Sequence, residues 1–181
     1  MSTTTAPIAA PPNAALPAPA WAVRVARLAA LTALPSGLWR LALGAGIPVG
    51  LSSALVRQLH VPGRGTVYAI ALSTFAEALA FLSMGLVRPW GQIAPTWLPL
   101  IGGRRIHPLA AVVPASLGAL AVTLITWRSA SGWYGPGAMG GPDAPHGLAG
   151  HIMTACYAPL LAWGPLLAVV AADYYRRSRR A

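Results

Sequence analysis

Residues 66–87 read TVYAIALSTFAEALAFLSMGLV, twenty-two residues in which Glu77 is the one charged side chain. A transmembrane helix needs about 20 predominantly apolar residues, so this stretch predicts a membrane span. A carboxyl group near the centre of a span is costly to bury and marks a candidate site. The stretch therefore indicates the environment of the protein and the first side chain whose role needs an explanation.

The composition of the whole chain also favours a membrane protein. Of its 181 residues, 56% are hydrophobic and 9% are charged, whereas soluble domains carry about a quarter charged residues. The net charge of +10 comes from thirteen Arg residues and no Lys. Because these arginines flank apolar stretches, they are typical of topology-determining residues, and we exclude nucleic acid as a partner. Cys156 is the single cysteine, which excludes an intrachain disulfide.

Three further apolar stretches complete the predicted fold, an all-α polytopic membrane bundle of four transmembrane helices. The expected spans are, approximately, residues 26–50, 66–87, 108–127 and 148–173. An Ala- and Pro-rich tail at residues 1–22 is typical of disordered chain, so the transmembrane domain is expected at residues 23–175. A basic tail follows at residues 176–181.

The first span allows two interpretations, because Pro35, Arg40 and Pro48 interrupt it. One interpretation is a single tilted or kinked helix over residues 26–50. The other is an interfacial segment up to Trp39, followed by a short span over residues 41–56, which makes Arg40 an interfacial anchor. We prefer the first, because residues 41–56 are fewer than the roughly 20 that a span needs.

The arginines predict the orientation of the four spans. The side that holds both tails and the loop at residues 88–107 carries nine arginines, and the other side carries three. Cytoplasmic segments are enriched in basic residues, so both termini are expected in the cytoplasm and the protein in the cell membrane. The lipid bilayer is thus the first expected partner, with anionic lipid at the cytoplasmic face.

Glu77 belongs to a candidate polar site inside the membrane. Ser73 and Thr74 lie one helical turn before it, on the same side of the helix. We weigh three roles for Glu77: binding a proton, cation or basic group, pairing with Arg40, or remaining a neutral hydrogen-bonded acid. The pair is slightly preferred, because Arg40 is the only other charged residue in the interior of an expected span, whereas Arg27 and Asp173 stand at span ends.

The opposite side carries weak metal-ligand candidates, Asp143, His146 and His151, with His60 in the other loop on that side. His and Asp side chains bind zinc, but this spacing matches no zinc motif. A solvated loop with scattered histidines is the preferred interpretation, and no cofactor is expected. The sequence also lacks nucleophile, phosphate-loop and metalloprotease motifs, so no catalytic residue is assigned.

Small residues at helical spacing predict close helix packing within the bundle. Gly46 and Gly50 form one such pair in the first expected span. Ala111, Ala115 and Ala119 form a second series in the third span.

Two segments carry a resemblance to known proteins. The first is RPWGQIAPTWLPL at residues 88–100, followed by GGRR at 102–105. The second is CYAPLL at 156–161, with WGPLL at 163–167 and an arginine tail. Both segments resemble those of small, uncharacterised four-helix integral membrane proteins of high-GC bacteria. The resemblance implies the four-helix architecture and no particular activity.

These observations predict a non-enzymatic structural or accessory subunit that acts through helix packing, with itself or with a partner membrane protein. The alternative is a small proton- or cation-linked transporter, or a ligand-binding membrane protein, that uses Glu77. The first hypothesis expects Glu77 to be paired with Arg40 and no water-filled cavity. The second expects a cavity that reaches Glu77.

Overall fold

The computed structural model describes residues 17–93, 102–104, 106–135 and 140–179, and this part of the chain is helical without strands. Most of the predicted N-terminal tail, at residues 1–16, lies outside the described residues, as do residues 94–101 of the 88–107 loop. The elements are α1 (Ala20–Leu31), α2 (Leu34–Gly44), α3 (Ser53–Gln58), α4 (Arg64–Ser83), η1 (Met84–Leu86), η2 (Pro89–Gly91), α5 (Pro108–Ser131), α6 (Gly147–Tyr157) and α7 (Leu160–Ser178).

Three helical segments are long and apolar enough to cross a membrane, among the residues that the structure describes. They are Arg64–Leu86, Pro108–Ser131 and Gly147–Ser178, the last formed by α6 and α7 together. They agree with three of the four expected spans within a few residues. The segment that corresponds to the third expected span begins at Pro108, as expected for a proline at a helix start.

The first expected span differs from the structure in both its bounds and its continuity. Helix already begins at Ala20, inside the expected tail, and α2 ends at Gly44 rather than at residue 50. A proline ring clashes with the carbonyl four residues before it. Pro35 stands four residues after the end of α1 at Leu31, and Pro48 stands four residues after the end of α2. Both helix ends agree with these proline positions, whereas Pro114 and Pro165 are accommodated inside α5 and α7.

The expected close helix packing is wrong for Gly46, where an added Cβ would meet nothing within 4 Å. At Gly50 a close contact is present, because an added Cβ would overlap Ala149 of α6. Neither glycine is helical, however, and their φ angles are +83° and +87°. This left-handed conformation favours glycine, so both residues serve the turns that follow α2.

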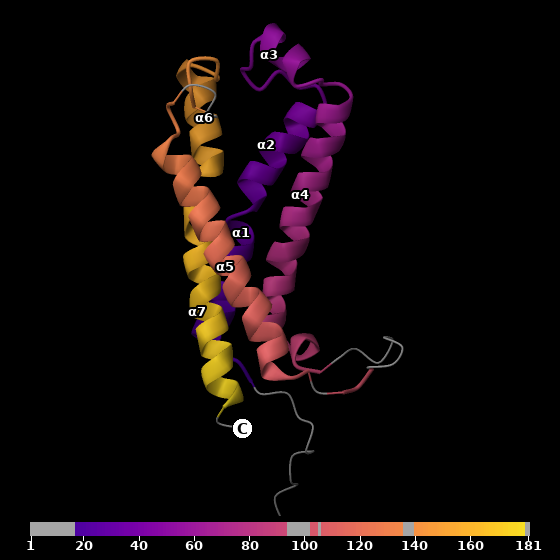
Figure 1. Ribbon diagram of the computed structural model, residues 1–181, viewed down its shortest axis with the longest axis vertical. Coiled ribbons are helices and arrows are strands. Elements are labelled where there is room, and N and C mark those ends of the chain that lie inside the picture. The colour runs from indigo at the N-terminus through magenta and orange to yellow at the C-terminus, as the bar shows by residue number, and fades with distance from the viewer. Residues whose placement is uncertain (1–16, 94–101, 105, 136–139, 180–181) are drawn as a thin grey trace, which may run out of the picture.

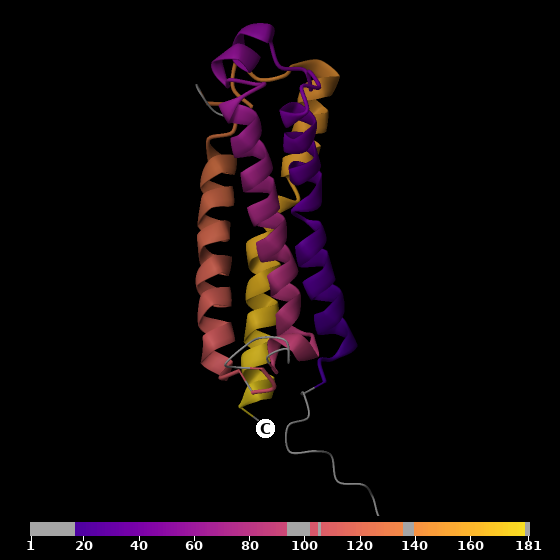
Figure 2. The same cartoon turned by 90° about the vertical axis from the view of Figure 1, so that its right-hand side faces the viewer.

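The helices form an elongated bundle (Figure 1). α1 and α2 follow one another along α4, with α1 also packed on α7, and α5 packs on α7 (Figure 2). The start of α1, the 3₁₀ turns η1 and η2, and the end of α7 lie at one end of the bundle. α3 and the start of α6 lie at the other end.

Alanines line the buried face of α1 and the break after it, and many large apolar residues lie on the outside of the bundle. Ala22, Ala26 and Ala29 of α1 and Ala33 in the break recur every three or four residues and are at most 1% exposed. The exposed side chains include Val67, Phe75 and Phe81 of α4, and Leu117, Leu124 and Ile125 of α5. Such an apolar outer surface is compatible with a membrane location.

Two helix breaks lie at the same buried cluster. Ala33, in the break between α1 and α2, packs in one cluster with Ala80 of α4 and Trp163 of α7. Leu160, the first residue of α7 after the break at Pro159, packs against this cluster. The break between α1 and α2 and the break between α6 and α7 therefore lie at about the same level of the bundle.

Candidate functional site

The polar side chains predicted from the sequence meet where α2 packs on α4. Arg40 of α2 donates a hydrogen bond from Nε to the Oγ of Ser73 on α4, over 3.1 Å. Ser73 is 2% exposed, so this contact lies inside the helix pair. A buried hydroxyl and a guanidinium thus each gain a partner that burial would otherwise deny them.

Glu77 lies one turn after Ser73, and its carboxylate faces a glycine of α2. A Cβ atom added to Gly37 would lie 3.0 Å from Oε1 of Glu77. The absence of a side chain at Gly37 therefore makes room for the carboxylate. Oε1 is buried and accepts no hydrogen bond from the part of the chain that the structure describes.

Arg40 and Glu77 do not form an ion pair in the described part of the chain. Within the described ranges, the ion pair found is that of Arg177 with Asp173, over 2.8 Å between Nε and Oδ2. The guanidinium of Arg40 contacts Ser73 instead, so the Arg40–Glu77 pair expected from the sequence is replaced by a hydrogen bond one turn away.

Tyr157, the last residue of α6, adds an aromatic ring to this site. The Cζ of Arg40 lies 5.8 Å from the centre of the Tyr157 ring, in a cation–π contact. The ring of Trp39 meets Tyr157 edge to face at 5.6 Å between ring centres. We call Gly37, Arg40, Ser73, Glu77 and Tyr157 the Arg40 cluster. It joins α2, α4 and α6 at one place.

Sequence reasoning found three members of the Arg40 cluster and missed two. Gly37 stands three residues before Arg40 and so shares its face of α2, which is a signal that the sequence does contain. The helix that places Tyr157 opposite Arg40 is set by tertiary packing, and no local pattern predicts it. Thr74 is exposed and does not belong to the cluster.

The weak metal candidates do not gather into a site. Among the described residues, no three His, Cys, Asp or Glu side chains lie close enough to hold a metal ion. A ring nitrogen of His146 instead lies 3.0 Å from the carbonyl oxygen of Pro142. His151 is an exposed residue of α6, and Asp143 is exposed in the turn before it.

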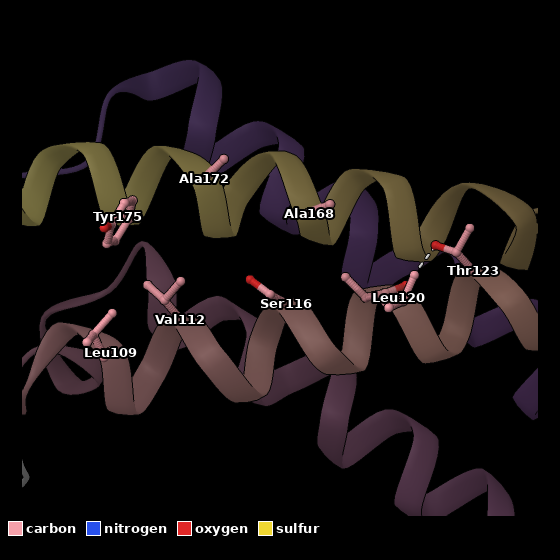
Figure 3. A pocket seen from close by; sticks show the side chains of 9 residues that line it. Leu109, Val112, Ser116, Leu120, Thr123, Ala168, Ala172 and Tyr175 are labelled. Carbon is pink, nitrogen blue, oxygen red and sulfur yellow. Dashed lines mark hydrogen bonds between the residues drawn. The ribbon is translucent and has the colours of Figure 1, made fainter.

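A groove of about 460 Å³ runs between α5 and α7, away from the Arg40 cluster (Figure 3). Its lining includes Leu109, Val112 and Ser116 of α5, and Ala168, Ala172 and Tyr175 of α7. No member of the Arg40 cluster lines this groove.

The two helices approach most closely beyond one end of this groove, where Gly164 of α7 meets α5. A Cβ at Gly164 would lie 2.7 Å from the carbonyl oxygen of Ala119, and it would overlap the side chain of Thr123. Trp127 also donates from Nε1 to the carbonyl oxygen of Leu161 over 3.2 Å. Pro165 stands four residues after Leu161 and leaves that carbonyl without its usual helical donor, so the indole replaces it.

The chain matches no protein-family model, and no curated protein or solved structure is significantly similar to it. The resemblance to small four-helix membrane proteins of high-GC bacteria therefore stays a prediction. The function has to be inferred from the geometry of the chain itself.

Proposed function

We propose that the chain is a four-span integral protein of the cell membrane, with both termini in the cytoplasm. In this proposal it has no catalytic activity and serves as a structural or accessory subunit through helix packing. α1 and α2 together run from residue 20 to residue 44. At 1.5 Å per residue this is about 37 Å, enough for the roughly 30 Å hydrocarbon core. The arginine-rich ends support the orientation. The start of α1 and the end of α7 also lie at the same end of the bundle (Figures 1 and 2).

Labelling of single cysteines tests the four spans and their orientation. Cys156→Ser provides the background, and Ala18→Cys, Arg57→Cys, Arg104→Cys and Ser178→Cys report the two ends. An impermeant maleimide should label positions 18, 104 and 178 from the cytoplasmic side only, and position 57 from the outside. Labelling of position 18 on the side opposite to 178 would show three spans and overturn the proposal.

The observation that supports the subunit role is the exposure of the apolar surface of α5. Only 6% of its most apolar 18-residue stretch is buried in the bundle. Its exposed side chains include Leu117 and Leu124, which are 62% and 61% exposed. α5 packs on α7, but a helix with so little of its surface buried offers most of that surface to lipid or to another transmembrane helix.

Particle mass in the membrane tests the subunit role. The protein is extracted from its native membrane in polymer nanodiscs, and the protein mass per particle is measured. We expect more than the 18.6 kDa of one chain. Leu117→Ala with Leu124→Ala should reduce the assembled fraction, while the matched pair Val67→Ala with Phe81→Ala on α4 should leave it unchanged. A single chain per particle would contradict the subunit role.

One observation favours a second candidate function, a small proton- or cation-linked transporter or ligand-binding membrane protein. The buried Oε1 of Glu77 has no hydrogen-bond partner in the described part of the chain, and such an oxygen is available to a proton or a cation. Flux of protons or monovalent cations into proteoliposomes tests this function. Flux lost in Glu77→Gln but kept in Asp173→Asn would replace the subunit proposal. Equal leakage with and without protein would leave the subunit proposal in place.

A further inference from the structure

The groove between α5 and α7 has the dimensions of one lipid chain. Its lining runs along α5 from Leu109 to Thr123, about 21 Å at 1.5 Å per residue. One leaflet contributes about 15 Å of hydrocarbon, so a groove of this length is long enough to follow an acyl chain through one leaflet. Its volume is about 460 Å³.

The groove is closed at one end and open at the other. The contact of Gly164 with Ala119 and Thr123 closes it in the middle of the bundle. From there α5 and α7 separate toward the end of the bundle that holds the C-terminus (Figures 1 and 3). We call the open end, between Leu109 and Tyr175, the groove mouth.

Positive charge stands at the groove mouth. Arg179 follows Tyr175 by four residues, on the same face of the helix, and its Cζ lies 5.2 Å from the centre of the Tyr175 ring. Arg179 is exposed, whereas Arg177 already binds Asp173 and the carbonyl oxygen of Leu86. Asp173 is the only acidic residue of α7, and its carboxylate is thus neutralised.

The start of α5 adds a partial positive charge, and Arg176 in the last turn of α7 offsets the opposite partial charge of that helix end. α5 begins at Pro108, beside the groove-lining Leu109, and its first turn contains no acidic residue. The N-terminal end of a helix carries a partial positive charge that favours phosphate groups. The groove mouth therefore has an arginine on one side and a helix start on the other, and the apolar groove begins between them.

We propose that this groove binds one anionic phospholipid. One acyl chain lies between α5 and α7, and the phosphate lies at the groove mouth against Arg179 and the start of α5. The lipid fills the space that the helices leave as they separate from Gly164, so it completes the packing of α5. This inference rests on the membrane location in the proposed function and adds a defined lipid site to it.

Lipid binding to the purified, delipidated protein tests this site. Native mass spectrometry measures the apparent Kd of the first bound phosphatidylglycerol and of the first phosphatidylcholine with the same acyl chains. We expect phosphatidylglycerol to bind about fivefold more tightly, because one arginine at a membrane surface contributes about that factor toward an anionic lipid. Equal affinities for the two lipids would overturn the proposal.

Two pairs of matched variants separate the headgroup contact from the groove. Arg179→Gln should abolish the preference for phosphatidylglycerol, while Arg24→Gln, which removes an exposed arginine of α1, should keep it. Ala168→Phe fills the groove and should weaken both lipids at least fivefold. Val169→Phe, at the neighbouring exposed position outside the lining, should not. The same effect within each pair would overturn the proposal.

Photolabelling of the unchanged protein keeps the test independent of any variant that fails to fold. Phosphatidylglycerol with a photoreactive group in its acyl chain should label residues 109–123 and 168–175 more strongly than the exposed residues of α4. Uniform labelling would overturn the site. A wild-type dimer that Ala168→Phe separates, with unchanged lipid binding, would assign the groove to a second copy of the chain instead.

A separate measurement distinguishes the failure of this site from the failure of the proposed function. Extraction of the native membrane with alkaline carbonate should leave the protein in the membrane. Release into the carbonate supernatant would overturn the proposed membrane location. Retention without lipid preference would overturn the lipid site alone.

Discussion

The α2–α4 and α5–α7 interfaces use glycine in opposite ways. Between α2 and α4, Gly37 makes room for a side chain, the carboxylate of Glu77. Between α5 and α7, Gly164 makes room for the other helix itself, because the Ala119 carbonyl oxygen and both the side chain and the backbone of Thr123 lie against it. The first interface is held by a polar and aromatic cluster. The second is held by the close contact at Gly164 together with the hydrogen bond from Trp127 to the Leu161 carbonyl.

This difference shows two ways to hold helices together where lipid weakens the hydrophobic effect between them. Helix association in a bilayer depends on van der Waals packing and on interhelical hydrogen bonds. The α5–α7 contact near Gly164 is of the first kind, and the Arg40–Ser73 contact is of the second. A substitution should therefore have different consequences at the two interfaces.

The largest effect is expected for Gly164→Leu. The new side chain overlaps α5, and overpacking of this kind costs up to about 3 kcal/mol, so α5 should separate from α7. Unfolding by SDS in mixed micelles, followed by circular dichroism, measures the loss. Gly118→Leu is the control, because a Cβ there meets nothing within 4 Å. Equal stability of the two variants would refute the close contact.

A smaller effect, about 2 kcal/mol, is expected for Gly37→Leu, because the new side chain collides with the carboxylate of Glu77. The added change Glu77→Ala removes that carboxylate and should restore most of the stability in the same SDS assay. At the other interface, Glu77→Ala should not rescue Gly164→Leu. Failure of the rescue at Gly37 would show that the carboxylate does not face this glycine.

A still smaller effect is expected from the hydrogen bond between Arg40 and Ser73. Double-mutant cycles for side-chain hydrogen bonds in a membrane protein average about 0.6 kcal/mol, since unfolded helices also find partners in the membrane. A cycle of Arg40→Met and Ser73→Ala should therefore give a coupling near that value. Arg40→Met with Thr74→Ala is the control cycle and should give no coupling, because Thr74 is exposed.

No effect is expected from zinc on the outer loop. Addition of zinc should leave the unfolding transition of the wild-type protein unchanged, because His146 already contacts the Pro142 carbonyl. His146→Ala and His151→Ala should behave alike in the presence of the metal. A zinc-dependent rise in stability that either substitution removes would revive the metal hypothesis.

Sequence reasoning succeeded where the information is local. The spans around Glu77 and after Pro108 follow from apolar length and from proline at a helix start. The break after Leu31 could also be predicted from local information, because Pro35 disturbs the carbonyl four residues earlier. The length that a span needs, however, favours a single tilted or kinked helix over residues 26–50.

The rest of the candidate site depends on which helices become neighbours. The sequence identifies Arg40 and Glu77 as charged residues in the interior of the expected spans, and it predicts an ion pair between them. The rotation of α2 on α4 instead brings Arg40 to Ser73 and Gly37 to Glu77. The position of Tyr157 depends on the end of α6, which no periodicity in the apolar stretch reveals.

The two helix breaks lie at one level of the bundle, at the cluster of Ala33 and Trp163. Among the helices that the structure describes, α4 and α5 continue unbroken through that level. We therefore expect the bundle to adapt to a thinner bilayer by flexing at Ala33 and Pro159, rather than by tilting as one rigid rod. Spin labels on α2 and α7 would then change their separation with lipid chain length, while labels on α1 and α7 would keep theirs.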